Sequence, residues 1–256
     1  MALNPANLAD YLLPPKAKVL LRGLLSPLIG FTTVSSWEEA VRKSVGYEDA
    51  DVVASAVKAE VIRAGNRWID GRTMQIATAF ASSKAETRPI KVLDIGGADG
   101  HYFHELEGLL GTGVFDWTVL ETEPMAARFA VQASQSLRWV FDSASLEIQY
   151  DVVLLSSVLQ YVQDPDSLLH MACQRGKSVI INRLPVVSGD KDIPTVQHLR
   201  MYGRRGSYPA WFFSKDRIFA VLSELGVVDA SWNVPEDRHV LRFREVQSIG
   251  ILITPN

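Results

Sequence analysis

The chain has 256 residues, enough for one large α/β domain with an appendage, and 47% of them are hydrophobic, as expected for a protein with a buried core. The formal net charge of −3 gives no sign of a polyanion-binding protein, so nucleic acid is a poor candidate partner. The single cysteine, Cys173, excludes an internal disulfide and a multi-cysteine zinc site, and an intracellular, cytoplasmic location is the natural expectation.

Residues 1–86 are predicted to form a helical N-terminal cap or lid. Ser36–Glu39 has the pattern of a capping box, and a later helix is expected over Arg67–Ser82. If this segment covers a site, four of its residues are candidate contacts: Trp37, Tyr47, Arg67 and Arg72.

The apolar stretch within residues 16–31 is interrupted by Arg22 and Pro27 and is too short to span a bilayer. Its basic residues would let it lie against a membrane surface. A helix packed against its own domain or a partner is the simpler interpretation.

The central motif begins with Ile90–Ile95, a short apolar run typical of a buried strand. A glycine turn follows, and a helix is expected over His101–Leu110. In an open α/β sheet a ligand binds at this place, beside the carboxyl ends of the strands. The turn reads G-G-A-D-G, which differs from the dinucleotide pattern G-x-G-x-x-G. Asp94 and Asp99 favour a cationic ligand over a pyrophosphate, which prefers bare N–H groups.

The string D-I-G-G-A-D-G resembles the first motif of class I methyltransferases that use S-adenosylmethionine. That cofactor carries an ammonium and a sulfonium close together, which suits an acidic turn. The resemblance implies a Rossmann-like α/β fold with a seven-stranded, mostly parallel sheet whose last strand is antiparallel. It implies cofactor contacts from Asp94, Gly96, Gly97, Ala98, Asp99 and Gly100. An ordinary turn without a ligand is the alternative.

The main domain is expected over residues 87–256, where strands and helices alternate as in a mostly parallel sheet. Further strands are expected at Trp117–Glu121, Arg138–Phe141, Asp151–Ser156, Lys177–Asn182, Val227–Trp232 and Ile249–Thr254. Helices are expected at Pro124–Ser134, from Pro165 to about Cys173 behind an Asp164 N-cap, and at Lys215–Leu225 behind a Ser214 N-cap.

Two acidic residues follow the second and third strands. Glu121 is placed to accept hydrogen bonds from both ribose hydroxyls, whereas Glu123 is interpreted as a solvated carboxylate at a helix start. In the methyltransferase family an acidic residue after the third strand accepts from the adenine amino group, which implies this role for Asp142. An N-cap for the following residues is the equal alternative.

Tyr150–Leu169 has the strand, small-residue turn and D-P pattern common in class I enzymes that act on small molecules. The resemblance implies that Ser156 and Ser157 pass beside the methionine part of the cofactor. Gln160 and Tyr161 would face the reaction pocket, where many family members have two histidines. The departure removes an imidazole that could serve as a base.

An insertion over Leu184–Phe213 is rich in aromatic and basic residues and poor in regular periodicity, so we predict that it forms the wall of an acceptor site. Its T-V-Q-H and Y-P-A-W-F-F-S strings resemble a bacterial family of methyltransferases associated with surface-glycan genes. His198 is our candidate general base, with Tyr161 or Tyr208 as orienting groups. Arginines that could bind a phosphate, or simply form an exposed basic loop, are Arg183, Arg200, Arg204 and Arg205.

Of the other histidines, His101 or His104 could contact the cofactor after the glycine turn, His170 is interpreted as structural or solvated, and His239 is placed in a polar loop. Since no histidine pair has metal-ligand spacing, no metal is predicted. The predicted function is methyl transfer from S-adenosylmethionine to a small polar acceptor such as a sugar or glycan precursor. The alternatives are a nicotinamide-dependent oxidoreductase or epimerase on a similar sheet, and a non-catalytic member that binds the cofactor without turnover.

Overall fold

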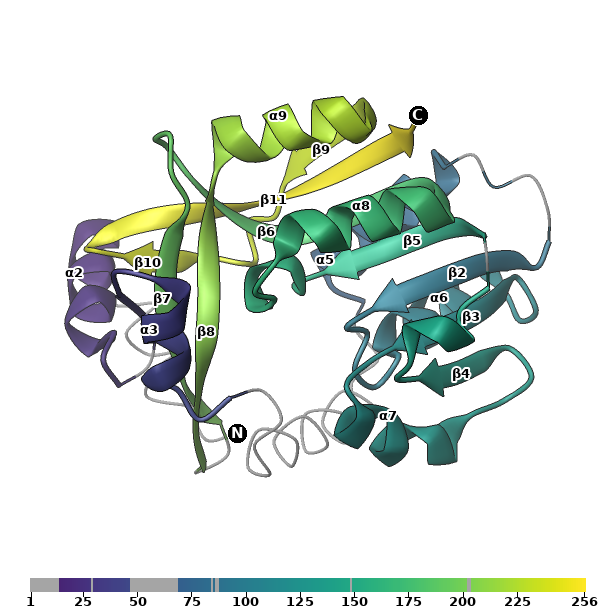
Figure 1. The fold of residues 1–256 in the computed structure, drawn as a ribbon, viewed down its shortest axis with the longest axis horizontal. Coiled ribbons are helices and arrows are strands. Elements are labelled where there is room, and N and C mark those ends of the chain that lie inside the picture. The colour runs from purple at the N-terminus through teal and green to yellow at the C-terminus, as the bar shows by residue number, and fades with distance from the viewer. Residues whose placement is uncertain are drawn as a thin grey trace.

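The computed structural model describes residues 14–28, 30–46, 69–83, 85, 88–147, 149–201 and 204–256, without the side chains of residues 200, 201, 204 and 205. Tyr47 and Arg67 lie outside the described residues, as do the side chains of three candidate phosphate-binding arginines: Arg200, Arg204 and Arg205. The described chain is a curled, mostly parallel sheet with helices on both faces (Figure 1).

The core of the sheet has the strand order β4–β3–β2–β5–β6–β11–β9. The first five strands are parallel, and β11 is antiparallel to both β6 and β9, as predicted for the last strand. The bounds are β2 Ile90–Ile95, β3 Phe115–Leu120, β4 Leu137–Val140, β5 Tyr150–Ser156, β6 Gly176–Val187, β9 Gly226–Asn233 and β11 Arg244–Pro255. β2 and β5 are central, buried strands, which explains why their sequences are almost continuously apolar.

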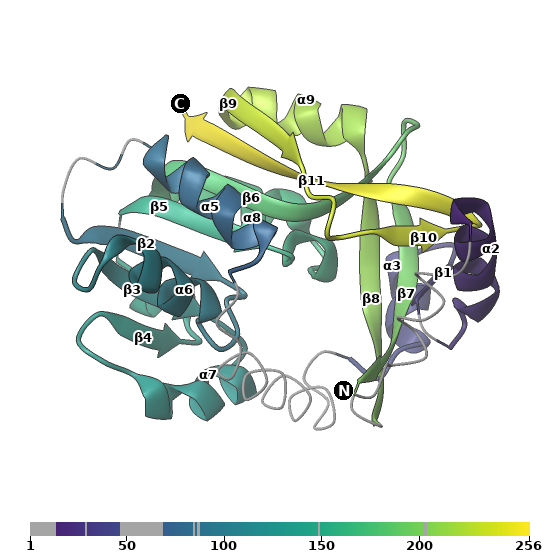
Figure 2. The same cartoon turned by 180° about the vertical axis from the view of Figure 1, so that it is seen from behind.

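Helices cover both faces of this core. On one face α5 (Gly71–Ala81), α6 (His101–Leu110) and α7 (Glu123–Phe129) pack around the fully buried Trp117 (Figure 2). On the other face α8 (Pro165–Arg175) and α9 (Lys215–Leu225) pack against a second apolar cluster (Figure 1). Burial of these two clusters is what holds the helices, since isolated helices of this length are marginal in water.

The predicted N-caps are confirmed for three helices. The Asp164 carboxylate accepts from the Ser167 N–H at 3.0 Å, and the Ser214 hydroxyl accepts from the Arg217 N–H at 3.2 Å. Ser36 caps α3 (Trp37–Arg42) in the same way. The expected helix over Arg67–Ser82 starts later: α5 begins at Gly71 because the Asp70 carboxylate accepts from the Thr73 N–H at 3.1 Å.

The seven-strand prediction is too small, because the described residues form eleven strands. The insertion forms regular secondary structure, which corrects its interpretation as a long loop. It contains the end of β6 and an antiparallel hairpin of β7 (Ile193–Met201) and β8 (Arg204–Ser214). Neighbours such as Thr195 and Val196, or Phe212 and Phe213, are all buried. Because both faces of the hairpin are covered, its sequence lacks a polar–apolar alternation.

The N-terminal segment is not purely helical, which corrects a second prediction. After α2 (Pro15–Leu25), β1 (Gly30–Thr33) pairs antiparallel with β7 and so joins the hairpin. A short β10 (His239–Leu241) pairs with β11 (Figure 2). Among the described helices none is long and apolar enough to cross a membrane.

Candidate functional site

The glycine turn joins β2 to α6 at the carboxyl edge of the sheet. Gly96 and Gly100 have φ angles of 70° and 69°, a conformation that residues with a side chain rarely adopt. Gly97 is required for a different reason: a Cβ there would lie 2.3 Å from Oδ2 of Asp94. The turn therefore packs directly on a carboxylate that lies beneath it.

Asp94 is buried at 1% exposure. Its Oδ2 accepts from Nε1 of Trp117 at 3.2 Å, and its Oδ1 has no hydrogen-bond partner in the described part of the chain. Burial, reinforced by the charges of Glu121 and Asp99, raises the pKa of Asp94 to about 7. The carboxylates of Asp94, Asp99 and Glu121 thus converge on one turn, as the sequence predicts. Oδ1 of Asp99 also lies 3.2 Å from Nδ1 of His101.

Glu121 follows β3 and its carboxylate turns back toward the glycine turn. It accepts from the N–H groups of Ala98 at 3.1 Å and Thr122 at 2.9 Å. Nε1 of Trp139 donates to the Ala98 carbonyl at 2.8 Å from the other side. Glu121 is buried while Glu123 is exposed, so the structure places Glu121 at the site and Glu123 outside it.

Asp142 follows β4 and is exposed. Its Oδ1 accepts from the Ala144 N–H at 2.8 Å and caps the 3₁₀ turn η2 (Ser143–Ser145). The N-cap interpretation is therefore confirmed, and the adenine contact stays a prediction.

The end of β5 brings the predicted serines and glutamine together. The Ser156 hydroxyl lies 3.0 Å from the hydroxyl of Tyr102 in the first turn of α6. Ser157 has a positive φ of 60° and accepts from Nε2 of Gln160 at 2.9 Å. Gln160 is buried, and its Oε1 has no partner among the residues that the structure describes. A second unpaired acceptor oxygen thus lies at the carboxyl edge.

The hairpin meets this edge through two tyrosines. Tyr161 in η3 (Leu159–Tyr161) and Tyr208 on β8 form an edge-to-face pair with ring centroids 4.9 Å apart. Burial raises the pKa of the Tyr161 phenol, with the Arg183 charge acting in the opposite direction. Nε1 of Trp211 donates to the Val162 carbonyl at 3.1 Å, which fixes the same junction.

The structure does not bring His198 to these tyrosines. In the β7–β8 register His198 pairs with Ser207, while its neighbour Gln197 pairs with Tyr208. Because side chains alternate along a strand, His198 and Tyr208 lie on opposite faces of the hairpin. Nε2 of His198 lies 2.9 Å from Oγ1 of Thr32, and burial lowers the His198 pKa.

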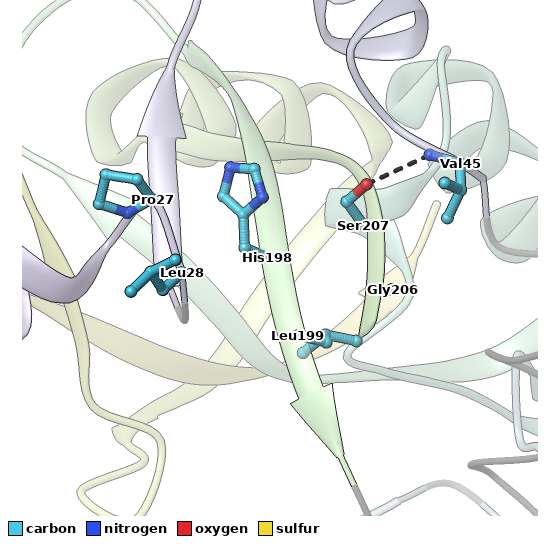
Figure 3. Close-up of a pocket in the computed structure, with 7 residues that line it drawn as sticks. All are labelled: Pro27, Leu28, Val45, His198, Leu199, Gly206 and Ser207. Carbon is cyan, nitrogen blue, oxygen red and sulfur yellow. Dashed lines mark hydrogen bonds between the residues drawn. The ribbon is translucent and has the colours of Figure 1, made fainter. Parts of the chain in front are cut away.

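His198 instead lines a cavity of about 220 Å³ on the far face of the hairpin (Figure 3). The other lining residues are Pro27, Leu28, Val45, Leu199, Gly206 and Ser207. This cavity contains none of the predicted cofactor residues.

A charged cluster that the sequence does not reveal lies beyond the end of β5, around Arg183 of β6. Arg183 occupies an irregular point of β6 with a φ of 60°, and it forms a bidentate pair with Asp237 at 2.9 and 3.0 Å. Arg72 of α5 approaches the same carboxylate at 3.8 Å, and Nε2 of His239 lies 4.0 Å from it. The Arg183 guanidinium is thus bound by a carboxylate and lies in a strand, which corrects its interpretation as an exposed loop residue.

Comparison with known proteins identifies the chain. The model of a family described as methyltransferase domain matches residues 66–210, more than half of the chain. The chain belongs to this methyltransferase family. It is therefore a methyltransferase. The matched region spans the glycine turn, Asp94 and Gln160 with their unpaired oxygens, and most of the hairpin. No curated protein matches the chain.

Several solved structures are similar to this methyltransferase. The cyclase SpnF superposes with a TM-score of 0.55 at 11% identity, over 89% of this chain and 98% of that chain, which shows a shared fold. The N-terminal domain of EvdMO1 with S-adenosylhomocysteine bound has a TM-score of 0.48 at 16% identity, over 96% and 99% of the two chains. An S-adenosylmethionine-dependent methyltransferase from Clostridium acetobutylicum has a TM-score of 0.49 at 11% identity, over 79% and 98%.

Proposed function

We propose that the enzyme binds S-adenosylmethionine over the glycine turn and transfers its methyl group to a small polar acceptor. The observation that carries the proposal is the pair of buried acceptor oxygens, Oδ1 of Asp94 and Oε1 of Gln160, which lack partners among the described residues. A buried acceptor without a donor costs about 1–3 kcal/mol, which a ligand that brings donors or positive charge would recover. An ammonium beside a sulfonium meets this need, whereas a pyrophosphate would be repelled by the carboxylates.

The remaining cofactor contacts follow from the placement of the predicted residues. Glu121 would accept from the ribose hydroxyls, and Asp142 would accept from the adenine amino group through the oxygen that does not cap η2. Ser156 and Ser157 would lie beside the methionine part. The glycine turn would contribute backbone N–H groups, because no side chain intervenes at Gly96 or Gly97.

S-adenosylmethionine supplies an electrophilic methyl group on a sulfonium. The protein's contribution is to align the acceptor with that methyl and to exclude water. Tyr161 and Tyr208 form an aromatic wall at the place where β8 meets η3, and an aromatic wall with a few polar groups suits a small ligand. The hairpin strings resemble methyltransferases associated with surface-glycan genes, and a sugar or glycan precursor is the acceptor that we propose.

Titration calorimetry tests the proposal directly. We expect the purified protein to bind S-adenosylmethionine and S-adenosylhomocysteine, because both carry the ammonium that the acidic turn requires. NAD should give no heat of binding, since its pyrophosphate would face Asp94 and Asp99. Binding of NAD without binding of S-adenosylmethionine would overturn the proposed function and favour a nicotinamide-dependent enzyme.

The ribose contact is tested by comparing two neighbouring carboxylates. Glu121→Ala should weaken S-adenosylhomocysteine binding by about 1–3 kcal/mol, because it removes charge-assisted hydrogen bonds. Glu123→Ala, a matched change at an exposed carboxylate two residues away, should leave the affinity almost unchanged. Glu121 also accepts from the N–H groups of Ala98 and Thr122, and Glu121→Ala removes these bonds as well. Glu121→Gln keeps the size of the side chain and removes only the charge. Equal losses for Glu121→Ala and Glu123→Ala would show that the wrong carboxylate was assigned.

A further inference from the structure

His239 lies on the same face of the hairpin as the two tyrosines. Its ring makes edge contacts with Phe31 of β1 and Phe212 of β8, with centroids 5.1 and 5.9 Å apart. Phe212 lies four positions after Tyr208 along β8, so the two side chains project from the same face. His239 therefore lies on the side that faces η3, whereas His198 projects from the opposite side.

The imidazole is positioned by packing, and the side chain of His239 is 18% exposed. Neither ring nitrogen has a hydrogen-bond partner among the described residues, and the nearest acid is Asp237, with Oδ2 4.0 Å from Nε2. Asp237 is held in turn by the bidentate Arg183 pair. A carboxylate fixed beside an imidazole is suited to stabilise the imidazolium that forms when the ring takes a proton.

The cluster also reaches the cofactor side of the edge. Asn182, the residue before Arg183, pairs with Ser156 at the end of β5, and Nε2 of Gln160 lies 3.5 Å from the Arg183 carbonyl oxygen. Tyr102 is hydrogen-bonded to Ser156 at the end of β5. His239, Asp237 and Arg183 therefore adjoin the end of the strand that is proposed to contact the methionine part.

The charges of the cluster balance one another. Arg183 pairs with Asp237, and Arg72 pairs with Asp70, whose Oδ2 accepts from Nε at 2.8 Å. Two guanidinium groups thus face two carboxylates, which leaves no excess positive charge in this set to select a phosphate. A neutral hydroxyl is the acceptor group that this arrangement suits.

We infer that His239 is the general base that removes the proton of an acceptor hydroxyl, an inference that rests on the proposed function. In the step, the acceptor oxygen forms a bond to the methyl carbon while the carbon–sulfur bond breaks and its electron pair returns to sulfur. The hydroxyl proton passes to the imidazole, and the resulting imidazolium, beside Asp237, releases it to solvent. Atoms and charge balance, and no further reactant is needed.

The groups that face His239 support the protonation state that this role requires. Burial lowers the pKa of His239, Arg183 lowers it further, and Asp237 opposes both effects. The ring is consequently neutral near pH 7 and able to accept a proton.

Nuclear magnetic resonance of the histidine Cε1–H groups tests the position of the base without a known acceptor. The probes are S-adenosylhomocysteine and sinefungin, which carries an ammonium where the transferred methyl would be. If His239 lies beside the methyl position, its pKa should be about one unit lower in the sinefungin complex than in the S-adenosylhomocysteine complex, because a nearby positive charge disfavours the imidazolium. His239→Gln assigns the resonance, and His170→Gln, at an exposed position of α8, is the matched control.

The outcomes separate the two candidate histidines. A shifted resonance that disappears in His239→Gln and persists in His198→Gln supports the inference. Identical titration of His239 in the two complexes, or a shifted resonance that disappears in His198→Gln, overturns it. Calorimetry on the same samples reports separately on the proposed function. If neither probe binds, the proposed methyl transfer is overturned, and the role of His239 as its base is overturned with it.

Discussion

Gly97→Ala is expected to weaken S-adenosylmethionine binding by about tenfold to hundredfold. The added Cβ would lie 2.3 Å from Oδ2 and 2.5 Å from Cγ of Asp94, so the carboxylate or the turn must shift. Asp94 has little freedom to move, because it is fully buried and bonded to Trp117. Forcing extra volume into a packed site costs about 1–3 kcal/mol, which corresponds to this range of affinity. Calorimetry with S-adenosylhomocysteine measures the loss.

Gly108→Ala is the matched control for this substitution. Gly108 lies in α6, and a Cβ there would meet no atom within 4 Å. Alanine in a helix interior is favoured over glycine by about 1 kcal/mol, so the control should bind the cofactor normally and melt slightly higher. Unchanged affinity in Gly97→Ala would show that the ligand does not depend on the Asp94 carboxylate.

The affinity for S-adenosylhomocysteine should rise by about tenfold per pH unit between about pH 5 and pH 6.5. The Asp94 pKa is raised to about 7 in the ligand-free protein, so below that value binding of the ammonium must first displace a proton. The ligand's α-ammonium, with a pKa of about 8, stays protonated in this window. Above pH 7 the dependence should level off. Calorimetry in two buffers of different ionisation enthalpy would detect the released proton.

Asp94→Asn is the matched variant for this pH dependence, since it keeps the size of the side chain. Its affinity should be lower and nearly independent of pH across the same window. The stability of the ligand-free protein should change as well. Because the folded state holds the Asp94 proton more tightly than the unfolded state, this stabilising contribution is complete below about pH 4 and is lost as the pH rises through about 7.

Melting temperatures measured against pH check that sign. Asp94→Asn should gain stability relative to the parent protein as the pH increases from 5 to about 8. A difference between the two proteins that stays constant over this range would mean that Asp94 titrates at its ordinary value, and the raised pKa would be wrong.

The glycine turn and its flanking elements could be predicted because their signals are local. The start of α8 depends on Asp164 and Pro165, and the bounds of α6 and α9 depend on residues within one turn of each end. The near-continuous apolar run of β5 predicted a central strand in the same way, and its residues are buried. Adjacent residues carry the necessary information in each of these cases.

The arrangement of the hairpin and of the Arg183–Asp237 pair depends on pairings between distant segments. Arg183 and Asp237 are 54 residues apart, and nothing in the loop that carries Asp237 indicates a partner on β6. The insertion places His198 and Tyr208 close together in sequence, but their orientation depends on the register of the hairpin. A shift of one residue in that pairing would reverse the face on which each lies, so the sequence could not decide whether His198 and Tyr208 share a face.

The pairing of β1 with β7 has a consequence for biosynthesis. Thr32 and its hydrogen-bonding partner His198 are 166 residues apart, so β1 emerges from the ribosome long before its neighbour exists. At about 5–20 residues per second, the delay is on the order of 10–30 s. Until β7 arrives, β1, which carries Phe31, has no native strand to join. The nascent chain must therefore keep this strand from pairing with other chains, and this end of the sheet can close only after most of the polypeptide has been made.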